Sequence, residues 1–316
     1  MSILTKRYAG FKRHFYRTGP IDFSKELKSY KTLLIHPVME PGREIFSLPA
    51  IESIIAQKGE RNVMLLINEK LKFFFKDIPS KKIFYKCFSS PLSSNYKKLK
   101  ESLKGKEYDI FVELNSFNED ILTMFALIPK SRIRMCVNGS RENPIFNMII
   151  TTDKLHNEIE RNNVVLKPLG IKRKKKRIDW QKHTATRKEK RKIGIAVYNN
   201  KTALRLFSLL KNRNFTPFLF VNERKKVEKM KKKIGDALLP IYPLEKVYEE
   251  SVSCESIITS INPVFSIGFL QRKRMLLLIE RDKNFLPFDG HHIEVLSLSE
   301  KSKSLFNKVN DFIEGK

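Results

Sequence analysis

Histidine and cysteine side chains, the usual metal ligands and nucleophiles, follow no spacing here that would bring them together. The three cysteines (Cys87, Cys136 and Cys254) form no CxxC pair, which predicts buried, reduced thiols in a cytosolic protein. His291 and His292 are adjacent, but neighbours in a strand point to opposite faces, so we do not expect them to share a metal ion. No HExxH and no GxSxG motif occurs. We therefore predict no metal centre and no serine-hydrolase site.

Glycine-rich phosphate loops are also missing from the sequence. Neither GxGxxG nor GxxxxGK[ST] can be formed from the 12 glycines. These motifs cradle dinucleotides and nucleoside triphosphates, so their absence argues against a standard dinucleotide oxidoreductase and against a P-loop NTPase.

The net charge is the abnormal property of the chain. Lys and Arg number 62 against 34 Asp and Glu, giving +28. Such an excess opposes compaction and attracts polyanions. Much of it lies in three stretches, with eight bases against two acids in 1–31, twelve against two in 172–192 and seven against two in 222–233. Nucleic acid, an anionic membrane and phosphorylated substrates are all candidate partners, and composition does not choose among them.

The elements that would position a site alternate between strands and helices. Short apolar runs predict strands, and apolar residues at helical spacing predict helices. The expected strands are 31–36, 62–67, 82–85, 108–114, 132–136, 192–198, 216–221, 255–259 and 275–279, and the expected helices are 45–55, 96–103, 120–127, 202–210, 223–234, 244–251 and 300–313. This alternation predicts βαβ units with parallel sheets.

The chain is long enough, at 316 residues and 41% apolar, for two doubly wound α/β domains. The predicted boundaries are a basic, aromatic N-terminal segment 1–30, a first Rossmann-like domain 31–171, a basic linker 172–191 and a second Rossmann-like domain 192–316. Ligands of such sheets bind beyond the carboxyl ends of the strands, and here we expect them in the cleft between the domains.

Several segments stand in a recognisable order: TLLIHP at 32–37 and GREIFSLPA at 42–50, YDIFVELN at 108–115, SRIRMCVNG at 131–139 and LGI at 169–171. In this order they resemble family 9 glycosyltransferases, the heptosyltransferase-like enzymes of lipopolysaccharide synthesis, over roughly residues 31–314. The resemblance implies a GT-B fold, in which two Rossmann-like domains face each other across a cleft. It also implies inverting, metal-independent transfer of a sugar from a nucleotide-diphosphate donor, with no other cofactor.

The resemblance places the acceptor side of the site in the first half of the chain, at Gly42, Arg43, Asn115 and Asn138. Members of the family carry an acidic residue, assigned as the catalytic base, directly after the glycine of the first turn. That position is Arg43 here, and an arginine does not accept a proton. Glu44, one position later, is the candidate base if the turn re-aims it. The structural alternative is a tight turn followed by a solvated helix start.

The donor side falls in the second half of the chain. The family's phosphate-binding lysine corresponds to Lys201, and its neighbours Asn199, Asn200 and Thr202 stand at a helix start, where N–H groups bind phosphate. The family's Asp-Ser-Gly…His stretch aligns with residues 259–264, which lack both the Asp and the His. Ser260 and Asn262 remain as hydrogen-bonding groups. The structural alternatives are a surface lysine and a capping turn before Pro263.

Two basic segments are candidates for contact with a membrane or another polyanion. Leu4, Tyr8, Phe11 and Phe15 form one stripe on a helix, with Arg13 among the bases around it, as in helices that bind anionic membranes. The alternative is a helix docked on its own domain. The second segment is the run Lys172, Arg173, Lys174, Lys175, Lys176 and Arg177, which equally suits a solvated linker.

We carry three hypotheses forward. The first is a glycosyltransferase that uses a membrane-associated glycan or lipid acceptor, in a cytoplasmic protein bound peripherally to the inner face of the cytoplasmic membrane. The second is a catalytically degenerate GT-B scaffold that binds a polyanion or a partner protein. The third, a nucleic-acid-binding protein, has basic runs in its favour but no recognised nucleic-acid module.

Overall fold

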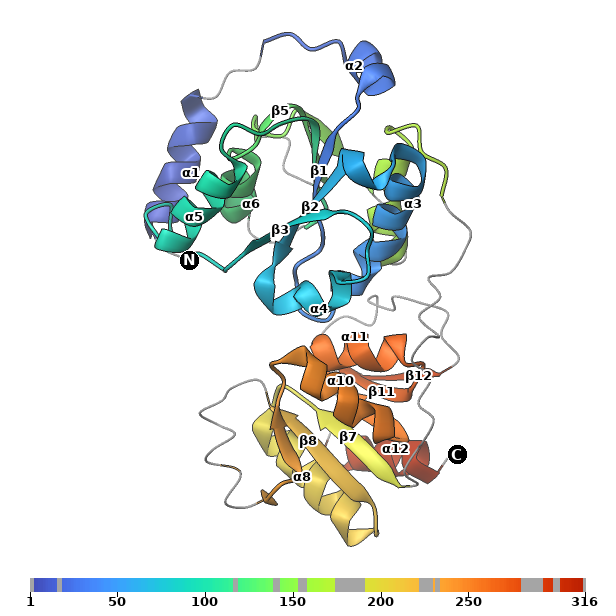
Figure 1. Ribbon diagram of the computed structural model, residues 1–316. Coiled ribbons are helices and arrows are strands. Elements are labelled where there is room, and N and C mark those ends of the chain that lie inside the picture. Colours follow the sequence, from blue (N-terminus) through green and yellow to red (C-terminus); the bar gives the residue numbers. More distant parts are fainter. Residues whose placement is uncertain are drawn as a thin grey trace. The chain divides into compact units, whose positions relative to one another are not determined.

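Parallel strands built from apolar runs organise both halves of the chain. The structure is a computed structural model that describes residues 3–15, 19–115, 119–138, 143–152, 158–173, 191–221, 230, 234–279, 292–297 and 302–314. It divides into a first unit, residues 1–40 with 44–177, and a second unit, residues 41–43 with 178–316 (Figure 1).

The sheet of the first unit has six parallel strands in the order β3-β2-β1-β4-β5-β6. This is the strand order of a Rossmann domain, with its topological switch point between the first and fourth strands. Ile35 in the central strand pairs with Leu65 on one side and Val112 on the other. The strands are β1 (Leu33–His36), β2 (Val63–Asn68), β3 (Lys81–Tyr85), β4 (Glu107–Glu113), β5 (Lys130–Val137) and β6 (Met148–Ile150).

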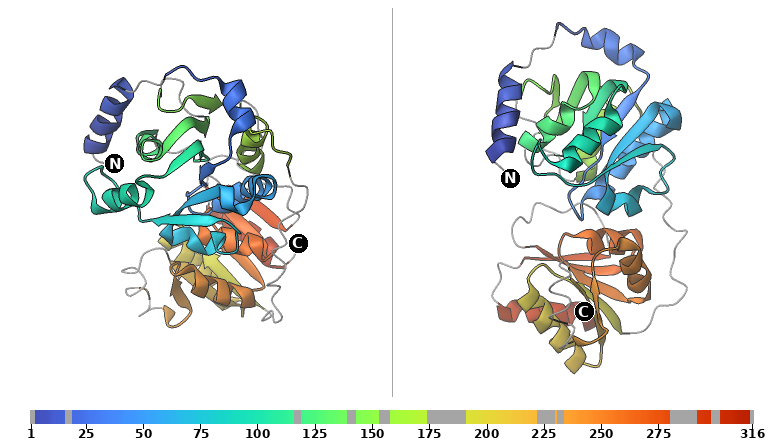
Figure 2. Two further views of the ribbon diagram at one scale, coloured as in Figure 1. Left: turned by 45° about the horizontal axis from the view of Figure 1, so that its top comes forward. Right: turned by 60° about the vertical axis from the view of Figure 1, so that its left-hand side comes forward.

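Helices cover both faces of this sheet. Helices α3 and α7 lie on one face, and α5 and α6 lie on the other, with α1 outside α6 (Figures 1 and 2). Gly59 ends α3 with a φ of 82°, and its N–H donates to Ile55 O. The helices are α1 (Ile3–Phe15), α2 (Phe23–Ser29), α3 (Leu48–Lys58), α4 (Lys72–Phe75), α5 (Ser94–Leu103), α6 (Glu119–Ala126) and α7 (Glu158–Asn163), with 3₁₀ turns η1 (Glu44–Ser47), η2 (Glu60–Asn62), η3 (Glu69–Leu71) and η4 (Val164–Leu166).

The second unit repeats the same plan. Its parallel strands run in the order β12-β11-β10-β7-β8-β9, so its switch point lies between β7 and β10. One face is sealed by α8 and α12, whose Leu206, Leu210, Val309 and Phe312 are fully buried. The elements are β7 (Lys192–Ala196), α8 (Asn200–Asn212), β8 (Thr216–Val221), β9 (Leu238–Pro240), α10 (Leu244–Ser253), β10 (Ser256–Thr259), α11 (Pro263–Leu270), β11 (Arg274–Ile279), β12 (Ile293–Ser297) and α12 (Ser302–Glu314).

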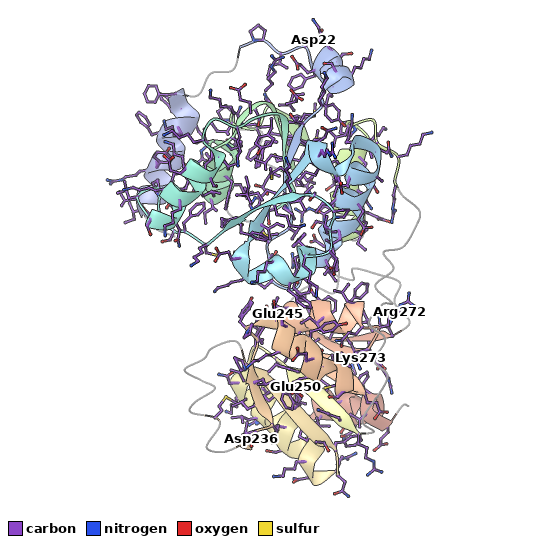
Figure 3. All side chains as sticks on the ribbon, viewed as in Figure 1. Asp22, Asp236, Glu245, Glu250, Arg272 and Lys273 are labelled. Atoms are coloured by element: carbon purple, nitrogen blue, oxygen red, sulfur yellow. The ribbon has the colours of Figure 1, made fainter. Side chains whose placement is uncertain are left out.

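A buried lysine ties the other face of the second unit together. Figure 3 shows Lys273 in the turn before β11, with Glu245 and Glu250 on the neighbouring α10. Its ammonium donates to the carbonyl oxygens of Val252 and Cys254, the latter at 2.6 Å. These carbonyls stand at the end of α10, where helix carbonyls have no partner within the helix. Lys273 therefore fixes the end of α10 against β11.

The α/β class and the pair of Rossmann-like domains predicted from the sequence are confirmed. Each predicted strand is present, within a few residues of its expected ends. The sequence pattern did not predict β6, β9, β12, α2, α4, α7 or α11. The prediction of buried thiols is confirmed for Cys136 and Cys254 and is wrong for Cys87, which is exposed. The predicted helix 223–234 falls outside the described residues except for Met230 and Ile234, as do residues 174–177 of the basic run and His291.

Candidate functional site

The switch point of the first unit holds a buried chain of polar side chains. His36 ends β1 and Glu113 ends β4, and the parallel pairing of these strands sets the two residues side by side. His36 Nδ1 lies 2.7 Å from Glu113 Oε2, and His36 Nε2 lies 2.9 Å from the Tyr85 hydroxyl at the end of β3. His36 and Glu113 are fully buried, and Tyr85 is 6% exposed.

The hydrogen-bond directions in this cluster follow from its chemistry. With Glu113 as a carboxylate, which only accepts, His36 donates from Nδ1 and accepts at Nε2 from the Tyr85 hydroxyl. Burial, and then the nearby Glu113 charge, raise the pKa of Tyr85 well above its usual value, so the phenol keeps the proton that it donates. Neutral His36 thus joins a phenol to a carboxylate without an unpaired ring nitrogen.

Asn115 connects this cluster to the segment that follows β1. Its backbone and side-chain N–H groups both donate to Glu113 Oε1, at 3.0 and 2.6 Å. Its side chain also donates to Pro37 O at 2.7 Å and accepts from Met39 N at 2.6 Å. The buried cluster therefore holds the backbone at 37–39, which leads to the predicted acceptor-side residues Gly42 and Arg43 and to Glu44.

The turn at 41–44 brings the candidate base to a covered position. Gly42 has a φ of 89°, in the left-handed region that favours glycine. Glu44 begins the 3₁₀ turn η1, which packs against α7, and its side chain is 0% exposed. Arg43 is half-buried. Glu44, the acid next to the position where family 9 enzymes carry their base, is therefore buried in this structure.

The remaining acceptor-side residue, Asn138, stands beyond the end of β5. Its φ is 53°, and its side chain makes two hydrogen bonds to Thr152: it donates to the hydroxyl at 2.6 Å and accepts from the backbone N at 2.8 Å. These bonds tie together the chain segments that follow β5 and β6. The Asn138 side chain is thus engaged with Thr152, away from the cluster around His36.

The switch point of the second unit carries the predicted donor-side residues on two neighbouring turns. After β7, Asn199 caps α8, and its side-chain oxygen accepts from the N–H groups of Lys201 and Thr202 at 3.0 and 3.2 Å. Asn200 is the first residue of α8. The N–H groups expected to meet a phosphate are therefore covered by the Asn199 carboxamide.

After β10, Asn262 joins the two central strands of the second unit. Its side chain donates to Ala196 O at 2.6 Å, and it accepts from Val264 N at 2.9 Å as the N-cap of α11. Ser260 beside it is 3% exposed, and its N–H donates to Ala196 O at 3.0 Å. The Tyr198 hydroxyl, in the turn after β7, donates to Ile261 O in the turn after β10. The switch-point loops are thus joined by short polar contacts.

Lys201 faces a groove between α8 and α12. The groove has a volume of about 480 Å³, and it is lined by Lys201, Leu204, Arg205, Ser208, Leu209 and Phe306. Two cations thus stand beside an apolar floor. This groove is formed by helix surfaces, whereas Ser260 and Asn262 belong to the strand-end turns.

The candidate polyanion-binding residues lie on the first unit. Phe11 and Phe15 on α1 are exposed, Tyr8 is half-buried, and Arg13 pairs with Asp120 of α6 at 2.6 Å. Lys172 and Arg173 are exposed beyond the last helical turn, with Lys172 O accepting from Gln57 Nε2 at 2.7 Å. Lys174, Lys175, Lys176 and Arg177 lie outside the described residues. Within the described part of the chain, no helix has the length and hydropathy to span a bilayer.

Metal-ligating groups do not gather in the described ranges: no set of three or more His, Cys, Asp or Glu side chains there is arranged to hold an ion.

By sequence, the chain matches no family model and no curated protein. Its structure does match solved structures. Escherichia coli heptosyltransferase WaaC with ADP-2-deoxy-2-fluoro heptose superimposes with a TM-score of 0.67 at 16% identity, covering 90% of this chain and 99% of the other. The chain has a GT-B fold.

Two further structures agree with that fold. A family 9 glycosyltransferase from Veillonella parvula gives a TM-score of 0.63 at 15% identity, covering 89% of this chain and 90% of the other. The UDP-GlcNAc 2-epimerase of Methanocaldococcus jannaschii in complex with UDP-GlcNAc and UDP gives 0.51 at 12% identity, covering 90% and 93%. The resemblance to family 9 glycosyltransferases noted from the sequence is thus confirmed at the level of the fold.

Proposed function

We propose that the protein transfers a sugar from a nucleotide-diphosphate donor to a glycan or lipid acceptor at a membrane. The observation that carries this proposal is the position of the polar residues: in both units they gather at the switch point of the sheet, where open α/β sheets bind ligands. The WaaC structures contain ADP or an ADP-linked fluoro-heptose, so ADP-linked heptose is the first donor to test. We place the protein in the cytoplasm, at the inner face of the cytoplasmic membrane.

The donor diphosphate would bind where β7 leads into α8. On binding, a phosphate oxygen would replace the Asn199 side chain as the acceptor for the N–H groups of Lys201 and Thr202. The Lys201 ammonium would add a positive charge beside the phosphate. Ser260 offers a hydroxyl from the neighbouring turn, and Asn262 holds that turn in place. These groups stabilise the negative charge that grows on the leaving nucleotide diphosphate.

Glu44 would act as the base of an inverting transfer. Its carboxylate takes the proton of the acceptor hydroxyl while that oxygen attacks the anomeric carbon, and the bond to the diphosphate breaks on the opposite face. Because Glu44 is buried, this role requires acceptor binding to expose it. Gly42, Arg43, Asn115 and Asn138 complete the acceptor side of the proposal.

Ligand binding is the first test. Thermal unfolding of the full chain is followed with ADP, UDP, GDP and their sugar conjugates at about 100 times the dissociation constant, where binding adds about 2.7 kcal/mol to stability. We expect one nucleotide series to raise the melting temperature and Lys201→Gln to reduce the rise. Lys211→Gln, an exposed lysine at the other end of α8, is the matched control. No stabilisation by any member of the panel would reject the proposal.

Turnover is the second test, with the donor found above and lipid-linked glycan acceptors. Glu44→Gln is expected to abolish transfer and leave nucleotide binding intact. Glu101→Gln, an exposed acid on α5, is expected to change neither.

A second function, a GT-B scaffold without transferase activity, is favoured by two observations. Arg43 stands where the family carries its acid, and the next acid, Glu44, is fully buried. This function predicts binding of a nucleotide or other polyanion with no sugar transfer. Transfer that depends on Glu44 would reject it.

A further inference from the structure

Helix α1 presents large apolar side chains to solvent. Ile3, Leu4, Phe11 and Phe15 are 72, 52, 59 and 64% exposed, and the rings of Phe11 and Phe15 lie 4.7 Å apart. Single exposed apolar residues are common on soluble proteins, but a contiguous group on one helix marks an interaction surface.

The opposite side of α1 is the one that holds it to the first unit. Thr5 and Ala9 are fully buried, and the Thr5 hydroxyl donates to Ser89 O. Arg13 pairs with Asp120 of α6. The half-buried Tyr8 shares a side-chain hydrogen bond with Tyr96 of α5, so it belongs to the docked side instead of the exposed row. The exposed apolar row, Ile3, Leu4, Phe11 and Phe15, therefore takes no part in the packing of α1 on the first unit. Figure 2 shows α1 at the outside of that unit.

The charges on α1 indicate which kind of partner would bind the row of exposed apolar side chains. At about 100° per residue, Leu4, Phe11 and Phe15 fall within about 40° of one another, with Arg7 on one side and Lys12 on the other. Lys6, Arg7, Lys12 and Arg13 are its charged residues, and the helix contains no acid. A protein groove or a second copy of the chain would cover the apolar row with no need for this one-signed border. An anionic lipid surface needs both features.

We propose that the exposed face of α1 docks on an anionic phospholipid bilayer. Leu4, Phe11 and Phe15 enter the boundary between headgroups and acyl chains, and Arg7 and Lys12, which border this row, contact lipid phosphates. The proposal rests on the membrane location in the proposed function and names α1 as the part of the chain that contacts the membrane. Membrane binding by α1 can be measured without a sugar donor and without sugar transfer.

The experiment is co-sedimentation of the full chain with vesicles of phosphatidylcholine alone or mixed with phosphatidylglycerol. Binding is expected with the mixed vesicles only, and it should weaken as salt rises because salt screens the lipid charge. Phe11→Ser with Phe15→Ser should reduce binding about 100-fold, at about tenfold per inserted ring. The control is Phe84→Ser, which changes another exposed ring, 46% exposed on β3.

The bases are tested in the same way. Arg7→Gln and Lys12→Gln together should reduce binding about 25-fold, at about fivefold per base. The control replaces two exposed lysines elsewhere, Lys167 and Lys211, with glutamine and has the same net charge as the test variant. Unchanged melting temperatures establish that all variants fold.

Three outcomes would overturn the docking surface: no binding to mixed vesicles, equal losses in the α1 variants and their controls, or a dimer that Phe11→Ser with Phe15→Ser dissociates without any lipid binding. Nucleotide-sugar binding is measured without vesicles. Failure of the docking surface and failure of the proposed function are therefore separate results.

Discussion

Removal of the Glu113 carboxylate tests the buried cluster of the first unit most directly. Glu113→Ala leaves three N–H donors without an acceptor, namely His36 Nδ1 and the backbone and side-chain N–H of Asn115. A buried donor that loses its acceptor costs about 1 kcal/mol or more, so we expect a loss of about 3–5 kcal/mol for the three donors together. For a unit of this size that predicts a fall in melting temperature of about 6–20 °C.

Glu113→Gln, compared with Glu113→Ala, tests whether the hydrogen bonds or the charge of Glu113 stabilise the cluster. Its amide oxygen can accept from Asn115, and its amide NH₂ can face His36, which then moves its own proton to Nε2 and donates to the Tyr85 oxygen. Each heavy-atom contact survives this exchange of tautomer and the Tyr85 hydroxyl proton alone loses its acceptor, so the expected cost is about 1 kcal/mol, or about 2–4 °C. The control is Glu250→Ala, which removes a partly exposed acid 3.5 Å from Lys192 and should cost less than about 1 kcal/mol.

Scanning calorimetry of the full chain is the assay, since it resolves units that unfold separately. The expected order of damage is Glu113→Ala well above Glu113→Gln, with Glu250→Ala smallest. If the alanine and glutamine variants were equally mild, the cluster would not be a hydrogen-bonded network in which His36 exchanges tautomers.

Three further predictions concern other polar and turn residues. Asp109 accepts from Lys31 N, Thr32 N and the Thr32 hydroxyl; burial alone would raise its pKa, but these bonds outweigh burial and lower it. The stabilisation from Asp109 is therefore full above the unfolded pKa and is lost as pH falls below about 4. Asp109→Asn should cost about 1–2 kcal/mol at pH 7. In urea unfolding measured against pH, the variant should show a smaller loss of stability below pH about 4 than the natural chain. Asn262→Asp keeps an acceptor for Val264 N but sets a carboxylate oxygen against Ala196 O, so urea unfolding should show a loss of about 2–3 kcal/mol, whereas Asn199→Ala should lose only a helix cap, about 1 kcal/mol. Gly42→Ala should cost more than about 2 kcal/mol by the same measurement, because the positive φ of Gly42 alone costs about 1–2 kcal/mol and an added Cβ would lie 2.5 Å from Asn262 N. A neutral effect would mean that the turn relaxes.

Most of the sheet framework could be predicted from the sequence, because buried parallel strands are continuous apolar runs. β1, β4, β7 and β11 all show this signature. The missed elements lack it. β6 and β9 are three-residue edge strands, and α11 is apolar on nearly every side because it is buried from Pro263 to Gly268, so it shows no amphipathic period.

The candidate site was harder to predict. His36 ends one predicted strand and Glu113 stands one residue before the end of another, but their hydrogen bond depends on which strands pair and in what register. One signal was available: both are charged or polar residues at the carboxyl end of a buried strand, and β1 and β4 are neighbours in Rossmann order. The exposed face of α1 differs from the predicted stripe for a similar reason, since helical spacing alone did not reveal that Tyr8 hydrogen-bonds to Tyr96.

The Asn199 cap has a consequence for how the second unit would handle nucleotides. Its carboxamide oxygen accepts from the same N–H groups that a phosphate oxygen would use, so a competitor for the phosphate is always present as part of the chain. An incoming anion gains only the difference between its own bonds and those of the amide. Such a turn favours quick exchange over tight retention, which would suit the proposed transferase because it must release its spent nucleotide after every cycle.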